Sequence, residues 1–135
     1  MSFGEHAKAD VGLIKCSLHP RCSTVLADIL GTELTYKIGA PGRHLVMNSL
    51  AVLAVAEVVG ADLALAALAL SELKAISGRG APIDLDLPGG AALLIDESYN
   101  ANPVSVDAAL ALLGQAPLGP QGRRIACLLY TSRCV

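Results

Sequence analysis

Two strand-like runs joined by a short, glycine-containing connection constrain the first half of the chain most strongly. The runs cover residues 24–30 and 33–38, with Gly31 and Thr32 between them. A two-residue connection with glycine in its first position favours a type II′ hairpin. Apolar and polar residues alternate along the second run, so one face of the hairpin is expected on a core and the other in water.

Helical periodicity replaces this alternation from His44 onward. Gly60 is expected to end a first helix, and Asp62 is expected to cap a second helix that runs to about Lys74. Both helices are more apolar than two surface helices of a small domain should be, so we expect their covering partner to lie outside this sequence. The positions at helical spacing are Leu45, Asn48, Val52, Val55, Ala56 and Val59 in the first helix, and Leu63, Ala66, Ala67, Leu70 and Leu73 in the second.

The second half predicts the opening of a β-α-β unit. Residues 77–82 indicate a linker, and the runs 83–87 and 91–95 predict a second hairpin. A polar loop follows, and Asn102 before a proline favours a helix start. Residues 124–126 are expected to begin the next strand. The apolar positions of the intervening helix are Val106, Ala109, Leu110 and Leu113.

Composition excludes two classes of protein. The chain has ten Lys and Arg against twelve Asp and Glu, and only 3% of its residues are aromatic. It therefore lacks the basic surplus and the stacking rings of a nucleic-acid binder, and no nucleic-acid partner is expected. The longest uncharged apolar run, residues 45–56, is shorter than the roughly 18 residues of a membrane span. The N-terminus has no signal-peptide pattern, so we expect a cytoplasmic protein without a membrane span.

The cysteines predict free thiols. Cys16, Cys22, Cys127 and Cys134 lack the pair spacing of zinc sites, and no export signal favours a disulfide framework. His19 lies between the first two cysteines, but the irregular spacing disfavours a metal site. We therefore expect no metal ligand in this chain.

The loop after residue 95 is the first candidate site. Asp96 and Glu97 lie where a strand leads to a helix N-terminus, and open α/β sheets bind ligands at that edge. Carboxylates suit ribose hydroxyls, and the free N–H groups of the helix start suit anions. The alternative is that both acids are solvated and that Asn102 is only a cap.

Two further groups could bind a nucleotide. Arg79 between two glycines would let a phosphate approach both backbone and guanidinium, although a flexible linker with an exposed arginine is the alternative. His44 and Asn48 share one helical face and could contact a base edge, although such pairs also serve capping and packing. The sequence has no G-x-x-x-x-G-K-[ST] motif, and no catalytic arrangement of nucleophile and base can be argued from its spacing.

At these residues the sequence resembles the Mur ligases. Residues 42–51, 78–80 and 96–103 are similar to successive motifs of that family, in order and in separation. The Ser-Tyr-Asn-Ala-Asn-Pro string resembles the MurF type, which joins D-alanyl-D-alanine to UDP-N-acetylmuramoyl-tripeptide. The resemblance covers residues 1–126, and it departs from the family at Leu45, where asparagine is frequent.

The resemblance implies an α/β fold drawn from two of the family's three domains. Residues 1–79 would be the C-terminal part of the P-loop-type, ATP-binding central domain, with a β-hairpin and two helices. Residues 80–126 would be the first β-α-β of the Rossmann-like C-terminal ligase domain. Residues 127–135 depart from the family, and Cys-Leu-Leu-Tyr-Thr-Ser is also encoded by one frame of a transposase sequencing adapter. We therefore expect a non-native, adapter-derived tail on a truncated sequence.

The resemblance also implies which residues would bind ATP. One group would lie on the adenine side, one would approach the ribose and phosphates, and one would line the same cleft. These are His44 and Asn48 for the adenine, Arg79 for the ribose and phosphates, Glu97 or alternatively Asp96 for the ribose, and Tyr99 and Asn100 for the cleft.

The implied activity is that of an ADP-forming ligase of peptidoglycan synthesis, and hence of cell wall biogenesis, cell shape and cell division. Its substrates would be ATP with Mg²⁺, UDP-N-acetylmuramoyl-tripeptide and D-alanyl-D-alanine, joined through an acyl phosphate. The P-loop and the Mg²⁺ ligands would lie outside this sequence. The chain alone is therefore expected to be inactive and poorly soluble or molten, and the complete ligase monomeric.

Two alternatives stay open. One is a related ligase of the folylpolyglutamate or cyanophycin synthetase type, which the loop string disfavours because those relatives tend to carry a histidine there. The other is a free-standing, non-catalytic interaction module, which has no reason to keep the motifs in register.

Overall fold

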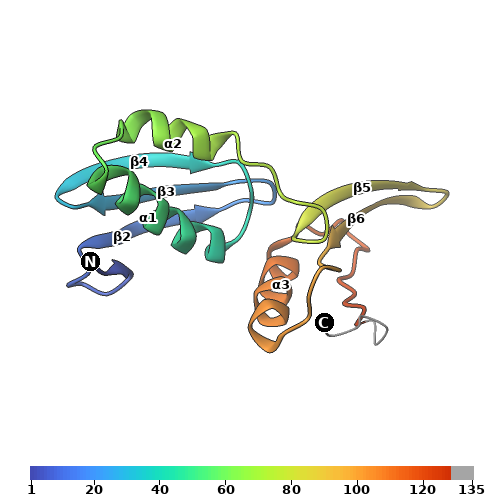
Figure 1. Ribbon diagram of the computed structural model, residues 1–135. Helices are drawn as coiled ribbons and strands as arrows, with labels where there is room; N and C mark the ends of the chain where they lie inside the picture. Colours follow the sequence, from blue (N-terminus) through green and yellow to red (C-terminus); the bar gives the residue numbers. More distant parts are fainter. Residues whose placement is uncertain (129–135) are drawn as a thin grey trace. The chain divides into compact units, whose positions relative to one another are not determined.

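The computed structural model describes residues 1–128, and the chain divides into two compact units (Figure 1). Unit 1 is Met1–Lys74, and unit 2 begins at Ala75. The division falls a few residues before the expected domain boundary at residues 79 and 80. Residues 129–135 lie outside the described residues, and with them most of the tail expected at 127–135.

Within the described residues, unit 1 is a four-stranded sheet in the order β1-β2-β3-β4, with two helices packed on one face (Figure 1). Only β1 and β2 pair in parallel. The alternation expected along residues 33–38 is confirmed, since Tyr36 and Ile38 are buried and Lys37 between them is exposed. The elements are β1 Phe3–Gly4, β2 Val11–Leu18, β3 Ser23–Ile29, β4 Thr32–Ile38, α1 Arg43–Val58 and α2 Leu63–Ser71.

The turn between β3 and β4 differs from the expected one. Ile29 pairs with Thr32, so Leu30 and Gly31 form the connection, with φ values of 52° and 91°. Two residues with positive φ make a type I′ turn, which matches the right-handed twist of the strands. The Gly31 N–H donates to Asp28 Oδ1 at 2.6 Å. The expected type II′ turn over Gly31 and Thr32 is therefore wrong by one position.

The core of unit 1 lies between the sheet and α1. Ile29 and Ile38 from the sheet are fully buried, and so are Val46, Leu50 and Leu53 from α1. The α1 stripe expected from periodicity is wrong, because Val52 and Val55 are 52% and 57% exposed. The apolar side chains of this helix are distributed around its circumference, so their spacing alone does not identify the face that packs on the sheet. The exposed valines agree with the expectation that α1 is more apolar than a surface helix.

The second helix begins and ends close to the expected positions. The Asp62 carboxylate accepts the N–H groups of Ala64 at 2.8 Å and Leu65 at 3.1 Å, so the expected cap is confirmed. The C-terminal end of α2 lies against the end of β4, where the Gly39 N–H donates to Leu70 O at 3.0 Å. A Cβ at Gly39 would lie 2.3 Å from Ser71 O, so this contact requires glycine.

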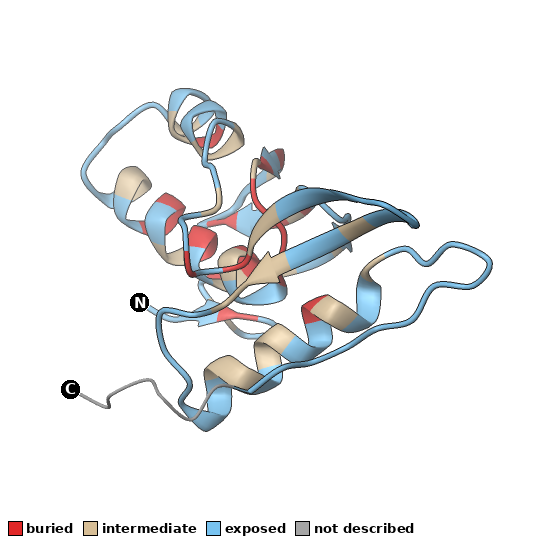
Figure 2. Cartoon of the chain, turned by 90° about the vertical axis from the view of Figure 1, so that its right-hand side faces the viewer, coloured by how far each residue is buried: buried red, intermediate tan, exposed pale blue. Residues whose placement is uncertain are grey.

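Unit 2 contains, in its described part, the hairpin of β5 (Ala81–Leu87) and β6 (Gly90–Asp96), followed by α3 (Pro103–Gln115). The expected helix start is confirmed, because Asn102 Oδ1 accepts the Ser105 N–H at 2.9 Å. Figure 2 shows that little of this unit is buried. Leu112 is its buried large side chain, whereas Leu110, which periodicity favoured, is exposed.

The strand expected at residues 124–126 is not formed. Residues 122–128 have no regular secondary structure, so the described part of unit 2 is β-β-α and not β-α-β. A strand exists only where it pairs with a neighbour. Ile125 is 71% exposed and finds no neighbouring strand within residues 1–128.

Candidate nucleotide site

Three hydrogen bonds from backbone N–H groups join the Gly78–Gly80 turn to the end of β6 and the loop that follows it. The Gly78 N–H donates to Asp96 Oδ2 at 2.9 Å, and the Gly80 N–H donates to Asp96 O at 2.9 Å. In return, the Tyr99 N–H donates to Gly78 O at 3.1 Å. We call this arrangement, residues 78–80 with 96–99, the loop junction. The turn within the expected linker at 77–82 is thus hydrogen-bonded to the loop and continues directly into β5.

Glycine is required on both sides of Arg79. Gly78 and Gly80 are buried and each has a φ of +77°. A Cβ would lie 3.2 Å from Tyr99 Cβ at the first position and 3.1 Å from Glu97 Oε1 at the second. The two glycines therefore let the turn touch the loop while Arg79 projects from it.

Arg79 stacks on Tyr99. The guanidinium carbon lies 4.0 Å from the centroid of the Tyr99 ring, which is a cation–π distance. Both residues are exposed, so the pair lies at the surface of unit 2. The structure thus brings two of the expected nucleotide-binding residues into direct contact.

The two acids of the loop have different environments. The Asp96 carboxylate accepts hydrogen bonds from Ser98 and from the Gly78 backbone, which hold the pKa of this carboxyl below its ordinary range. Glu97 is half-buried, and burial raises its pKa. The charge of Asp96 raises the Glu97 pKa further, while Arg79 opposes both effects. Asp96 therefore serves the backbone of the junction, whereas the Glu97 side chain lies beside Gly80 without such a role.

Ser98 is a junction residue that the sequence-based prediction missed. Its N–H donates to Asp96 Oδ1 at 3.1 Å, which closes an Asx turn over Asp96–Ser98. An aspartate two residues before a serine is the signal that could have revealed it. The neighbouring Asn100 is exposed, and its Oδ1 lies 2.7 Å from the Ala101 N–H.

The other two candidates belong to unit 1. His44 lies in the first turn of α1 and Asn48 one turn later, and both are exposed. The His44 ring packs on the backbone before the helix, since a Cβ at Gly42 would be 2.7 Å from His44 Cε1. Partial burial lowers the pKa of His44, which favours a neutral imidazole that can both donate and accept a hydrogen bond.

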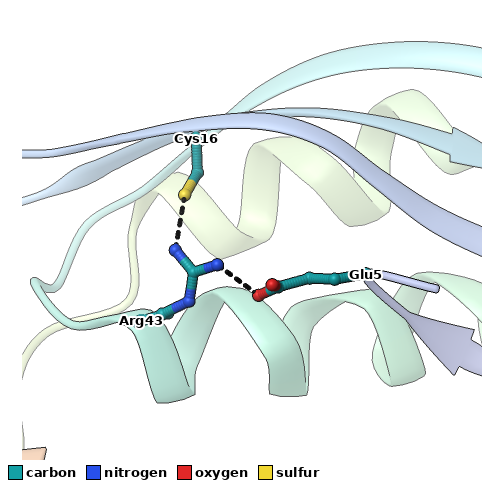
Figure 3. Close-up of polar contacts among 3 residues, drawn as sticks. All are labelled: Glu5, Cys16 and Arg43. Atoms are coloured by element: carbon teal, nitrogen blue, oxygen red, sulfur yellow. Dashed lines mark hydrogen bonds and ion pairs between the residues drawn. The ribbon is translucent and has the colours of Figure 1, made fainter.

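Arg43, the first residue of α1, has a structural role (Figure 3). Its guanidinium pairs with the Glu5 carboxylate and lies 3.7 Å from Cys16 Sγ. The ion pair is about half exposed, so it contributes at most about 1 kcal/mol to stability. It fixes the N-terminal segment against the start of α1.

Two absences hold for residues 1–128. No group of three or more His, Cys, Asp and Glu side chains in this range is placed to hold a metal ion. None of the helices described has the length and apolarity needed to cross a membrane. Cys16, Cys22 and Cys127 are free thiols, and Cys134 lies outside the described residues.

Known proteins resemble the chain in sequence. The UDP-N-acetylmuramoyl-tripeptide–D-alanyl-D-alanine ligase of Escherichia coli is 44% identical over 96 residues, which are 64% of this chain and 21% of that ligase. The UDP-N-acetylmuramate–L-alanine ligase of Streptomyces avermitilis is 32% identical over 111 residues, which are 82% of this chain and 23% of that ligase. No protein-family model matches the chain.

Solved structures resemble it in fold. MurF from Acinetobacter baumannii superposes with a TM-score of 0.76 at 31% identity, over 87% of this chain and 24% of that one. The MurF ligase of Thermotoga maritima in complex with ADP has a TM-score of 0.67 at 21% identity, over 86% of this chain and 26% of that one. The second likeness shows the fold alone.

These matches relate the chain to the Mur ligases. The chain resembles a fragment of a Mur ligase, as its motifs implied. The chain spans only about a fifth to a quarter of the length of the relatives that it matches.

Proposed function

We propose that the chain forms part of the ATP site of a cytoplasmic MurF-type ligase, which adds D-alanyl-D-alanine to UDP-N-acetylmuramoyl-tripeptide. The loop junction carries this proposal. It holds a guanidinium and a half-buried carboxyl on hydrogen-bonded backbone, the groups that a nucleotide's phosphates and ribose require. The 44% identical Escherichia coli relative is an enzyme of this type, which supports the MurF assignment.

In this proposal the candidate residues lie near different parts of the nucleotide. Arg79 would approach the ribose and phosphates, while His44 and Asn48 would lie on the adenine side. Glu97 is preferred to Asp96 for the ribose, because the Asp96 carboxylate already accepts hydrogen bonds from Gly78 and Ser98. Tyr99 and Asn100 line the same cleft. The related Thermotoga maritima MurF that was solved with ADP supports a nucleotide as the ligand.

The proposed reaction forms an amide bond in two steps. The tripeptide carboxylate attacks the γ-phosphorus of ATP, which yields an acyl phosphate and ADP. The amine of D-alanyl-D-alanine then attacks the acyl carbon, phosphate leaves, and the amine loses a proton. Mg²⁺ would neutralise the charge of the phosphates, and residues 1–128 offer no cluster to bind it. In this proposal the chain contributes to nucleotide binding, and the chain alone is expected to be inactive.

Phosphate release by the complete gene product, a monomer in this proposal, tests the function. We expect release with ATP, UDP-N-acetylmuramoyl-tripeptide and D-alanyl-D-alanine, and none when UDP-N-acetylmuramate replaces the tripeptide substrate and L-alanine replaces D-alanyl-D-alanine. Release with the second pair only would assign the protein to the UDP-N-acetylmuramate–L-alanine ligases. Release with a folate and glutamate only would assign it to the folylpolyglutamate synthetase type. If none of these substrate sets led to phosphate release, an interaction module would be favoured.

A further inference from the structure

We infer that Tyr99 is a positioning residue, whose ring holds the Arg79 guanidinium in the orientation that meets the nucleotide phosphates. The inference rests on the proposed function, because it concerns how Arg79 is presented to ATP. It follows from the 4.0 Å stack of the guanidinium on the ring.

The backbone fixes both partners of the stack. The Tyr99 N–H donates to Gly78 O at 3.1 Å, so the backbone of Tyr99 is joined to the residue that directly precedes Arg79. The Arg79 N–H donates to Ile76 O at 2.9 Å. The Tyr99 side chain is 67% exposed, so core packing does not explain its position. The contact that the structure gives this ring is the one with the Arg79 guanidinium.

The stack suits a phosphate ligand. An exposed arginine samples many rotamers, and ordering it on binding costs free energy. A ring under the guanidinium plane removes part of that cost in advance and leaves the N–H groups at the edge of the plane available for a phosphate. The Glu97 carboxylate also attracts Arg79, and the ring favours the stacked orientation over rotation toward that acid.

A double-mutant cycle on the complete gene product tests the inference, with ADP affinity measured by titration calorimetry. We expect Tyr99→Leu to weaken ADP binding by about two- to fivefold, the value of an exposed cation–π contact, and Tyr99→Phe to retain it. Arg79→Ala should weaken binding at least as much. Tyr99→Leu added to Arg79→Ala should then have no further effect, because the ring acts through the arginine.

The possible outcomes separate the inference from the proposed function. Unchanged affinity in Tyr99→Leu, or an equal loss with and without Arg79, would overturn the positioning role. A wild-type protein that binds no ADP would instead refute the proposed nucleotide site. In that case the NMR resonances of the Arg79 side chain decide on the stack. Their upfield ring-current shift should be present in the wild type and in Tyr99→Phe, and its absence from the wild type would overturn the inference.

Discussion

The Asp96 carboxylate accepts the backbone N–H of Gly78 at 2.9 Å, although the two residues are separated by the whole β5–β6 hairpin. The same carboxylate also accepts the Ser98 N–H, with its other oxygen. One acidic side chain thus connects the turn that carries Arg79 to the loop that carries Glu97. The segments that carry these charged groups are therefore joined through hydrogen bonds from backbone N–H groups to one carboxylate.

Asp96→Asn should loosen the loop junction. An amide offers one acceptor oxygen in place of two, so either Gly78 or Ser98 loses its partner. We expect faster hydrogen exchange at one of these amides, measured by NMR, with unchanged exchange in α1. Asp62→Asn is the matched control, because asparagine caps a helix about as well as aspartate. Unchanged exchange at both amides would contradict the role of Asp96.

Low pH should loosen the same junction. The folded-state pKa of Asp96 is lowered from its ordinary value of 3.8, so its stabilising effect is fully present above that value. The effect is lost as the pH falls through the lowered folded-state pKa. We expect exchange at Gly78 and Ser98, corrected for the intrinsic rate, to accelerate only below about pH 4. Acceleration that begins near neutral pH would point to another group.

The titration of Glu97 should respond to its two charged neighbours in opposite directions. Asp96 raises the pKa of Glu97, and Arg79 lowers it. We therefore expect Asp96→Asn to lower this pKa and Arg79→Ala to raise it, as measured by ¹³C NMR of the carboxyl carbon. Shifts in the same direction would show that the loop rearranges and that charge does not control the titration.

Gly39→Ala should destabilise unit 1. The new methyl group would lie 2.3 Å from Ser71 O and 2.4 Å from Leu73 O, which are backbone atoms at and just after the C-terminal end of α2. Overpacking of this kind costs about 1–3 kcal/mol of unfolding free energy. Gly12→Ala is the matched control within the same sheet, because a Cβ there meets no atom within 4 Å. Equal unfolding free energies of the two variants in urea would contradict the close contact.

The buried hydroxyl pair of Tyr36 and Ser49 should respond unequally to the removal of either partner. The hydroxyls lie 2.7 Å apart, and Ser49 donates to Val46 O, so Tyr36 is the donor of the pair. Ser49→Ala strands the buried Tyr36 hydroxyl and should cost about 1–3 kcal/mol of unfolding free energy. Tyr36→Phe leaves Ser49 bonded and should cost about 1 kcal/mol, through the hydrogen bond alone. The reverse order in thermal unfolding would contradict this assignment of the donor.

The sequence predicted the elements whose causes are local. The Asp62 and Asn102 caps follow from residues within one helical turn, and the hairpin strands follow from alternation. The α1 face was missed because apolar residues surround that helix, and only the sheet decides which of them are buried. The strand at 124–126 was wrong because a strand depends on a neighbour that the local sequence does not specify.

The candidate site shows the same division. The sequence could predict that Arg79, which lies between two glycines, and Glu97 are candidate nucleotide-binding residues. The distinct roles of the two acids could not, because the hydrogen bond from Gly78 to Asp96 joins distant parts of the chain. The stack of Arg79 on Tyr99 depends on the same contact between loops.

The hydrogen bonds at the base of the β5–β6 hairpin have a consequence for length variation. Gly78 and Gly80 are tied to Asp96 at the base, whereas Pro88 and Gly89 form the open tip. Residue pairs inserted or deleted at the tip change the reach of the hairpin but leave the spacing of Arg79 and Glu97 intact. The tip is therefore where related chains can diverge in length without loss of the site, and where a reporter group can be inserted.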